Sequence, residues 1–222
     1  MKRCNHYETA FESYLRQERL AYVAVNEQRR SLTGAGSLKS VDFIVSPSPR
    51  PWAGSGARAR WLIDVKGRAF PSGRARGRRQ YWRNWVTSDD IRSLTEWSRR
   101  FGDGFEAAFV FAYWLRADRS PTPPEQVLYH QGRPYAFVAV RAADYADAAK
   151  PLSKKWGTAS VPVGRFREIA VPVAEFLHEP DTPGTLASEG SGTAGEDYLE
   201  GDSVSEIGVF AAGAVPHPLR HS

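Results

Sequence analysis

Residues 61–67 read WLIDVKG, a run whose alternation is typical of a β-strand. Successive side chains of an extended strand point to opposite faces, so the apolar residues at odd positions share one face. Asp64 and Lys66 share the other face with Leu62. Burying a charge is costly unless it is paired or binds a metal ion. A carboxylate and an ammonium on a strand otherwise suited to a core therefore indicate a functional site.

A second acid, Asp42, begins the preceding predicted strand, VDFIV at residues 41–45. If the two strands pair as a hairpin, Asp42 and Asp64 converge on one side. Two carboxylates and a carbonyl oxygen, that of Val65, make an oxygen-rich site suited to Mg²⁺ or Mn²⁺. Such an ion would polarise a phosphodiester and activate a bound water, while Lys66 would position or deprotonate that water or neutralise phosphate charge. The alternative is a structural ion pair of Asp64 and Lys66 on an exposed strand face, with Asp42 as a turn residue.

A third acid is expected from the first helix, which the periodicity of apolar residues predicts at residues 5–19. At about 100° per residue from Tyr7, Glu8 lies at about 100° and flanks the apolar stripe. Glu12 lies at about 140° and points further outward. Glu8 is therefore the favoured inward acid, and Glu12 is the alternative.

This order of acids resembles the PD-(D/E)xK nuclease superfamily, which includes restriction endonucleases and archaeal Holliday junction resolvases. The resemblance covers roughly residues 5–115. It implies a restriction-endonuclease-like α/β fold, with a mixed central β-sheet flanked by helices and a metal site at one end of the sheet. By this likeness Glu8 matches the helix glutamate, Asp42 the first strand acid, and Asp64 with Lys66 the second motif.

Two positions depart from the superfamily pattern. Val41 stands where Pro is frequent, and Asp64 stands where Glu is common. The segment between the two strands, residues 46–59, is long. Residues 6–12, HYETAFE, also resemble a functionally uncharacterised bacterial group known by the signature HYExAFE.

Charge is distributed unevenly along the chain. Residues 1–178 carry 29 Lys and Arg against 17 Asp and Glu, whereas residues 179–222 carry one Arg and 8 acids. A strongly basic body suggests an anionic partner, nucleic acid first. Residues 179–222 are rich in Gly, Ser, Pro and acids and hold too few large apolar residues for a core. We therefore expect a nuclease-like α/β domain at 1–178 and a disordered acidic tail at 179–222.

Basic charge is densest just after Lys66, where residues 68–83 hold six arginines. Guanidinium groups suit bidentate contacts with phosphate, so this segment would hold a nucleic-acid backbone beside the metal site. Trp82 and Trp85 are interleaved with the arginines and are expected in the core, the alternative being that they stack on unpaired bases. The expected phosphate contacts are Arg68, Arg74, Arg76, Arg78 and Arg79, together with Lys39 and Ser40.

The rest of the pattern predicts further elements of a mixed α/β protein. Residues 31–40 are expected to form a Gly/Ser turn region. The other predicted elements are strands at 20–25 and 105–115, a helix capped by Thr87 or Ser88, a hairpin at 127–141, a short helix at 143–150 and an edge strand at 167–173.

Several function classes are excluded. A single cysteine, Cys4, rules out an internal disulfide and a cysteine-rich zinc site. The N-terminal residues lack the apolar segment of a signal peptide, and no run approaches about eighteen apolar residues, so we expect a cytoplasmic protein with no membrane partner.

We expect a metal-dependent nuclease acting on DNA rather than RNA, in repair, recombination or defence; a homodimer is possible. The alternatives are a non-catalytic nucleic-acid-binding module on the same fold and a structural or interaction protein.

Overall fold

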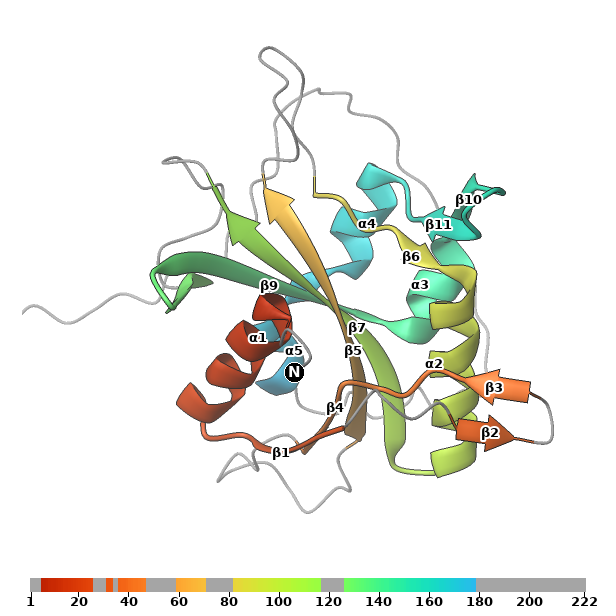
Figure 1. Cartoon of the computed structure of the whole chain (residues 1–222), viewed down its shortest axis with the longest axis horizontal. Coiled ribbons are helices and arrows are strands. Elements are labelled where there is room, and N and C mark those ends of the chain that lie inside the picture. Colours follow the sequence, from red (N-terminus) through yellow and green to blue (C-terminus); the bar gives the residue numbers. More distant parts are fainter. Residues whose placement is uncertain are drawn as a thin grey trace, which may run out of the picture. The chain divides into compact units, whose positions relative to one another are not determined.

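A mixed β-sheet forms the centre of the fold (Figure 1). The computed structural model describes residues 5–25, 31–33, 36–46, 59–70, 82–116 and 126–178. Seven strands form the sheet in the order β1-β4-β5-β7-β9-β12, with β8 paired to β9. β5 and β7 run parallel, and the other neighbouring pairs are antiparallel. The strands are β1 (Ala21–Ala24), β4 (Phe43–Ser46), β5 (Arg60–Phe70), β7 (Phe105–Leu115), β8 (Leu128–His130), β9 (Arg133–Arg141) and β12 (Val171–Pro172).

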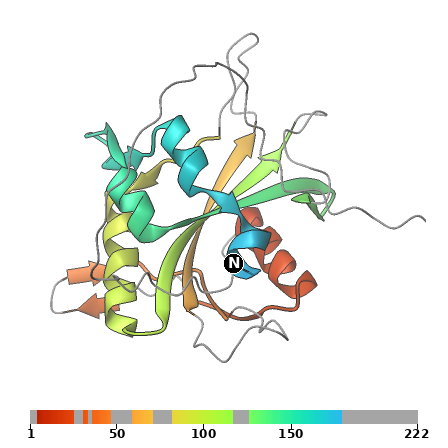
Figure 2. The ribbon, with the colours of Figure 1, turned by 180° about the vertical axis from the view of Figure 1, so that it is seen from behind.

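Helices cover both faces of this sheet, and Figure 2 shows the same arrangement from behind. One face carries α1 (His6–Gln17) and α5 (Val173–His178). The other carries α2 (Ser88–Phe101), α3 (Ala142–Ala148) and α4 (Val163–Ile169). The expected α/β class, a mixed central sheet flanked by helices, is confirmed. Within the described segments, no helix has the length and apolar character needed to cross a membrane.

The alternation of side chains along β5 divides the core in two. Ile63 and Val65 lie in the core beneath α1, whereas Leu62 lies in the core beneath α2. Because Asp64 and Lys66 follow Leu62 at steps of two residues, they face the α2 side of the sheet.

The first helix forms as its periodicity predicts. The side chain of Asn5 accepts a hydrogen bond from the backbone N–H of Tyr7 at 3.2 Å and caps the helix. The buried residues of α1 are Ala10, Phe11, Tyr14 and Leu15.

The second helix provides the crossover that two parallel strands require, leading from β5 to β7. Thr87 is its cap, one of the two caps expected. A capping box joins Thr87 and Asp90, because the Thr87 hydroxyl accepts from the Asp90 N–H at 3.1 Å and the Asp90 carboxylate accepts from the Thr87 N–H at 2.8 Å. The helix ends at Gly102, whose φ of 75° is in the left-handed region.

Two predictions about secondary structure were wrong. Within 31–40, expected to be a turn region, β2 (Ser31–Thr33) pairs with β3 (Gly36–Leu38). Most of the strand expected at 167–173 is replaced by the end of α4 and the start of α5. Only Val171 and Pro172 are extended, and they lie at the edge of the sheet beside β9, as expected of a strand with a proline.

A small second sheet was not predicted. It consists of β10 (Lys150–Ser153), β11 (Thr158–Ser160) and β6 (Val86–Thr87) in the order β10-β11-β6. Each strand is too short for its periodicity to stand out in the sequence. The pairing of β11 with β6 holds this sheet at the beginning of α2.

We predict that Gly67→Ala lowers the free energy of unfolding. A Cβ at Gly67 would lie 2.1 Å from Cδ2 of Tyr7, so the tyrosine ring or the first turn of α1 must move. A loss of about 1–3 kcal/mol is expected from this overpacking, measured by urea denaturation.

Gly164→Ala, in α4, is the matched control, because a Cβ there meets nothing within 4 Å. It should leave stability unchanged or raise it, since Ala favours a helix over Gly by about 1 kcal/mol. Tyr7→Ala added to Gly67→Ala should destabilise less than the sum of the two single changes. Strict additivity would contradict the contact between β5 and α1.

Candidate active site

The candidate site lies at the start of β4, just beyond the last pair of residues that join β4 and β5. The two strands pair up to Phe43 and Ile63, and the N–H of Asp42 still donates to the carbonyl of Ile63 at 2.9 Å. β5 continues to Phe70, past its pairing with β4, and the side chain of Asp42 forms the next hydrogen bond to β5. Its Oδ2 accepts the backbone N–H of Val65 at 2.6 Å, and the residue is 4% exposed. The hairpin expected from the sequence therefore forms and brings Asp42 to the acid-x-Lys segment.

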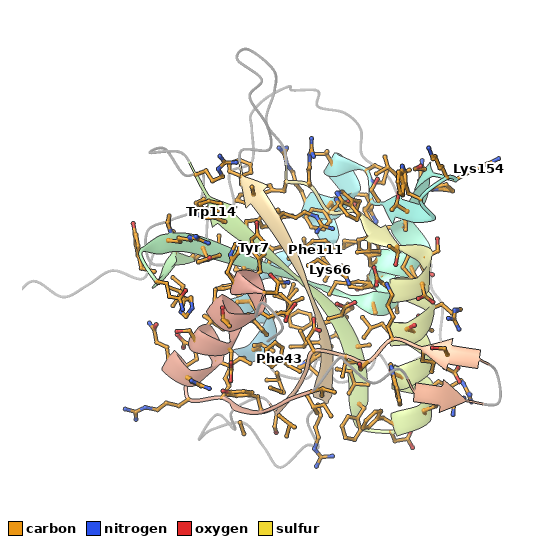
Figure 3. All side chains as sticks on the ribbon, in the orientation of Figure 1. Tyr7, Phe43, Lys66, Phe111, Trp114 and Lys154 are labelled. Atoms are coloured by element: carbon orange, nitrogen blue, oxygen red, sulfur yellow. The ribbon has the colours of Figure 1, made fainter. Side chains whose placement is uncertain are left out.

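Asp64 and Lys66 form an ion pair on the α2 face of β5, as Figure 3 shows for the position of Lys66. The Lys66 ammonium lies 2.7 Å from Oδ2 of Asp64 and 3.2 Å from Oδ1 of Asp90. The Asp42 side chain also lies close enough to lower the pKa of the Asp64 carboxyl group. Three acids and one lysine thus share a largely buried space between β5 and α2.

The acids around Lys66 favour its charged form. Burial alone would lower its pKa, but the carboxylates of Asp64 and Asp90 outweigh burial and raise the pKa above its ordinary value. Burial raises the pKa of Asp64, against the opposing effect of Lys66. The ammonium form of Lys66 is therefore favoured in this structure.

Asp90 was not identified from the sequence as a site residue. It lies in the first turn of α2, where its carboxylate belongs to the capping box. Burial would raise its pKa, but Lys66, Lys39 and Thr87 hold the pKa at about 2. The sequence signal was the spacing of Thr87 and Asp90, which places an acid at the third helical position beside β5.

Lys39 is bound within the protein, whereas the Oγ of Ser40 is buried without a hydrogen bond among the described residues. The Lys39 ammonium lies 2.7 Å from Oδ1 of Asp90 and 3.3 Å from the Thr87 hydroxyl. Phosphate binding by either residue therefore stays a prediction, and for Lys39 a phosphate would compete with Asp90.

Arg68 extends the charged face of β5 but is bound to the protein itself. Its guanidinium lies 4.0 Å from the ring centroid of Trp85 and donates to the carbonyls of Trp85 and Gly67. Burial lowers its pKa from the ordinary value of arginine. Arg74, Arg76, Arg78 and Arg79 lie outside the described residues.

The two tryptophans that were expected in the core lie in different surroundings. Trp82 stacks on Phe70, with ring centroids 4.2 Å apart, and meets Tyr113 edge-on, so the core interpretation holds for it. Trp85 is 37% exposed, and the core interpretation is wrong for it.

Glu8 is not brought into the cluster. The side-chain amide of Asn5 donates to its carboxylate at 2.6 Å. Its neighbour Tyr7 packs against Gly67, so the first turn of α1 lies beside β5 just beyond Lys66, on the opposite face. The described residues contain no group of three His, Cys, Asp or Glu arranged to hold a metal ion. The alternative acid, Glu12, is bound to Arg16 and Tyr22 on the surface of α1.

The donor atoms nevertheless fit a small divalent cation. Asp42 and Asp64 supply carboxylate oxygens from neighbouring side chains. The N–H and C=O of one strand residue point to the same side, so the Val65 carbonyl faces the side on which Asp42 binds its N–H. Mg²⁺ is commonly bound through one or two carboxylates and keeps several waters. Asp42, Asp64 and the Val65 carbonyl are therefore the described oxygen donors that such an ion would use.

Comparisons with known proteins add little. No family model matches the chain, so membership of the HYExAFE group is not shown. No curated protein matches it. Among solved structures it resembles Hjc, a Holliday junction resolvase from the archaeal hyperthermophile Archaeoglobus fulgidus, with 13% identity and a TM-score of 0.42 over 78% of this chain and 93% of that chain. A likeness of this size carries no function from one chain to the other.

We predict that Asp90→Asn destabilises the fold by about 2 kcal/mol at neutral pH, because the folded-state pKa near 2 lies well below the ordinary value. A depressed pKa stabilises the fold above the unfolded-state pKa, and this stabilisation is lost as the pH falls through the folded-state value. The difference between the variant and the wild type should therefore shrink from pH 7 to pH 3 in urea denaturation.

Asp89→Asn is the control. Asp89 lies in the same helical turn but is 33% exposed, and it pairs with Arg92 at the surface. Such pairs contribute about 0–1 kcal/mol, so the change should be small at both pH values. A loss at pH 7 as large as that of Asp90→Asn would show that any charge in this turn has the same effect.

Proposed function

We propose that the chain is a metal-dependent nuclease that hydrolyses phosphodiester bonds in DNA, in repair, recombination or defence. One observation carries the proposal. Where β4 leaves β5, the carboxyl groups of Asp42 and Asp64 meet, with the Lys66 ammonium 2.7 Å from Asp64. Two acids and a cation at the open end of a strand pair form a site that can hold both a divalent cation and a phosphate.

Each group has a distinct role. Asp42, Asp64 and the Val65 carbonyl would hold Mg²⁺ or Mn²⁺, which when bound polarises the phosphodiester and lowers the pKa of a water. Lys66 remains an ammonium and neutralises charge that develops on the phosphate in the transition state. Asp90 keeps Lys66 charged and positioned, since it contacts the ammonium at 3.2 Å.

The positive charge of residues 1–178 favours nucleic acid as the substrate. The excess of Lys and Arg in residues 1–178 favours a polyanion and raises its rate of encounter. Glu8 is proposed as a further metal-binding acid, contributed from the first turn of α1. The Arg68–Arg79 segment is proposed to hold the DNA backbone, with Lys39 and Ser40 beside it.

A second candidate is a nucleic-acid-binding module that does not cleave. The observation that favours it is that Lys66 is already neutralised by Asp64 and Asp90. No third metal-binding acid joins Asp42 and Asp64 within the described segments. This candidate predicts salt-dependent binding that needs no metal and survives Asp64→Ala.

We predict metal-dependent cleavage that requires Asp64 and Lys66. Wild-type protein is incubated with single-stranded, double-stranded and branched DNA in Mg²⁺, Mn²⁺ or EDTA, beside Asp64→Ala and Lys66→Ala. Cleavage should disappear in EDTA, and each change should lower the rate at least about a hundredfold, as loss of a metal ligand or transition-state cation does.

Asp89→Asn serves here as the control for a nearby charge, and it should cleave at the wild-type rate. Thermal unfolding of each variant separates loss of chemistry from loss of fold. Binding without cleavage in every folded protein would overturn the nuclease proposal and leave the binding module. Cleavage that persists in EDTA would place the activity elsewhere.

We predict that Glu8→Gln slows cleavage and that Glu12→Gln does not. Glu8, which accepts from Asn5 at 2.6 Å, lies in the turn of α1 that packs beside β5 just beyond Lys66 on the opposite face, whereas Glu12 is bound to Arg16 and Tyr22 further along the helix. The measurement is the cleavage rate over a titration of Mg²⁺. For Glu8→Gln, the Mg²⁺ concentration at half-maximal rate should rise, as expected of a weakened metal site. Equal titration curves for Glu8→Gln and the wild type would remove Glu8 from the site.

A further inference from the structure

The tip of the β10–β11 hairpin presents an aromatic ring among lysines. Trp156 is 72% exposed, and its neighbours Lys154 and Lys155 are also exposed. Figure 3 shows Lys154 projecting outward from the hairpin. Residues 149–157 hold three lysines and no acid. The Lys155 ammonium lies 5.4 Å from the centroid of the indole ring, so the ring itself is flanked by positive charge.

Hydrogen bonds of the backbone close this tip and anchor its base. Gly157 has a φ of 53°, which closes the turn, and its N–H donates to the Lys154 carbonyl at 3.3 Å. The N–H of Trp156 donates to Oγ of Ser153 at 3.4 Å. The Gly157 carbonyl accepts the N–H of Ser88, the first residue of α2, at 2.7 Å. An aromatic surface that is already ordered loses little entropy when a ligand stacks on it.

The same contacts connect the base of the hairpin to α2, the helix that carries Asp90. Thr158 pairs with Thr87, the cap of α2. Thr87 shares the capping box with Asp90, whose Oδ1 lies 3.2 Å from the Lys66 ammonium. A short chain of backbone and side-chain contacts therefore joins Gly157 to Lys66.

A groove of about 470 Å³ lies at the base of the hairpin. Its walls include Trp85, Leu152 and Val163, which are 37%, 58% and 38% exposed, and Arg83 adds a cation. Asn84 fixes the groove, because its side chain donates to and accepts from the backbone of Val161 at 3.0 and 3.1 Å. Apolar walls with a cation at the rim suit the flat face of a base and its phosphate.

We infer that the hairpin tip and this groove bind unpaired nucleotides, which deepens the proposed function and rests on it. Trp156 stacks on an exposed base, Lys154 and Lys155 contact the phosphates on either side, and the groove receives an adjoining base. The substrate class is then DNA that contains unpaired nucleotides. A fully paired duplex offers the lysines its phosphates but hides the base faces that Trp156 needs.

Fluorescence anisotropy tests this inference with the full chain in EDTA, so that nothing is cleaved. The probes are labelled oligothymidylate and a fully paired duplex of equal length. Trp156→Ala should raise the Kd for oligothymidylate about five- to a hundredfold and change the Kd for the duplex little. Trp156→Phe should retain most of the affinity, because Phe also stacks.

Tyr129→Ala is the matched control. Tyr129 is 75% exposed on the β8–β9 hairpin, so the change removes an equally accessible ring from another hairpin. It should leave both Kd values unchanged. Thermal unfolding should show that Trp156→Ala and Tyr129→Ala are both folded.

Salt dependence provides a second readout. Replacing Lys154 and Lys155 with Gln should reduce the slope of log K against log salt for oligothymidylate by about 0.7 for each lysine. A merely structural role for the lysines would leave this slope unchanged.

Two results would overturn the inference: an unchanged Kd for oligothymidylate in Trp156→Ala, or an equal loss for duplex and single strand. The first would leave the tip as a contact for another kind of partner, such as a protein. Failure of the nuclease proposal is distinct, because it appears as absent cleavage in Mg²⁺ and Mn²⁺ whatever Trp156→Ala does to binding.

Discussion

The hydrogen bond from the Val65 N–H to the Asp42 carboxylate is the contact on which the site depends. β4 stops pairing where β5 still has residues to pair, and the acid continues the ladder by its side chain. This bond fixes the register of β5 at the point where its charged residues begin. A shift of the strand register by one residue would point the side chains of Asp64 and Lys66 into the apolar core beneath α1. The same hydrogen bond therefore sets both the pairing of the strands and the face on which the charged side chains lie.

The second constraint is the sharing of Lys66 between Asp64 on β5 and Asp90 on α2. A buried ammonium with one acid is poorly compensated, whereas two acids from different elements hold it charged. Asp90 also caps α2 through Thr87, so the same carboxylate orients the helix and the cation. A phosphate that approaches Lys66 must compete with an acid that the helix holds in place.

Local pattern was enough to predict the centre of this fold. Alternation at 61–67 and the apolar run at 105–115 predicted β5 and β7, and the convergence of Asp42 and Asp64 followed from pairing of adjacent strands. The pairing of Lys39 with Asp90 could not be predicted, because it joins residues 51 positions apart that share no local signal. The small sheet of β6, β10 and β11 was missed for the same reason. Its strands of two to four residues are held by tertiary partners such as Asn84 and Val161.

The separation of the hairpin tip from the core has an evolutionary consequence. Asn84 and the β11–β6 pairing anchor the base of the hairpin, whereas Lys154, Lys155 and Trp156 contact neither core cluster. Substitutions at the tip can accumulate without loss of fold, since surface positions away from packed contacts change stability by about 0.5 kcal/mol or less. Residues 154–156 can thus change while the fold around the acids and Lys66 is kept, so that the properties of the tip can vary without a change in the strands behind it.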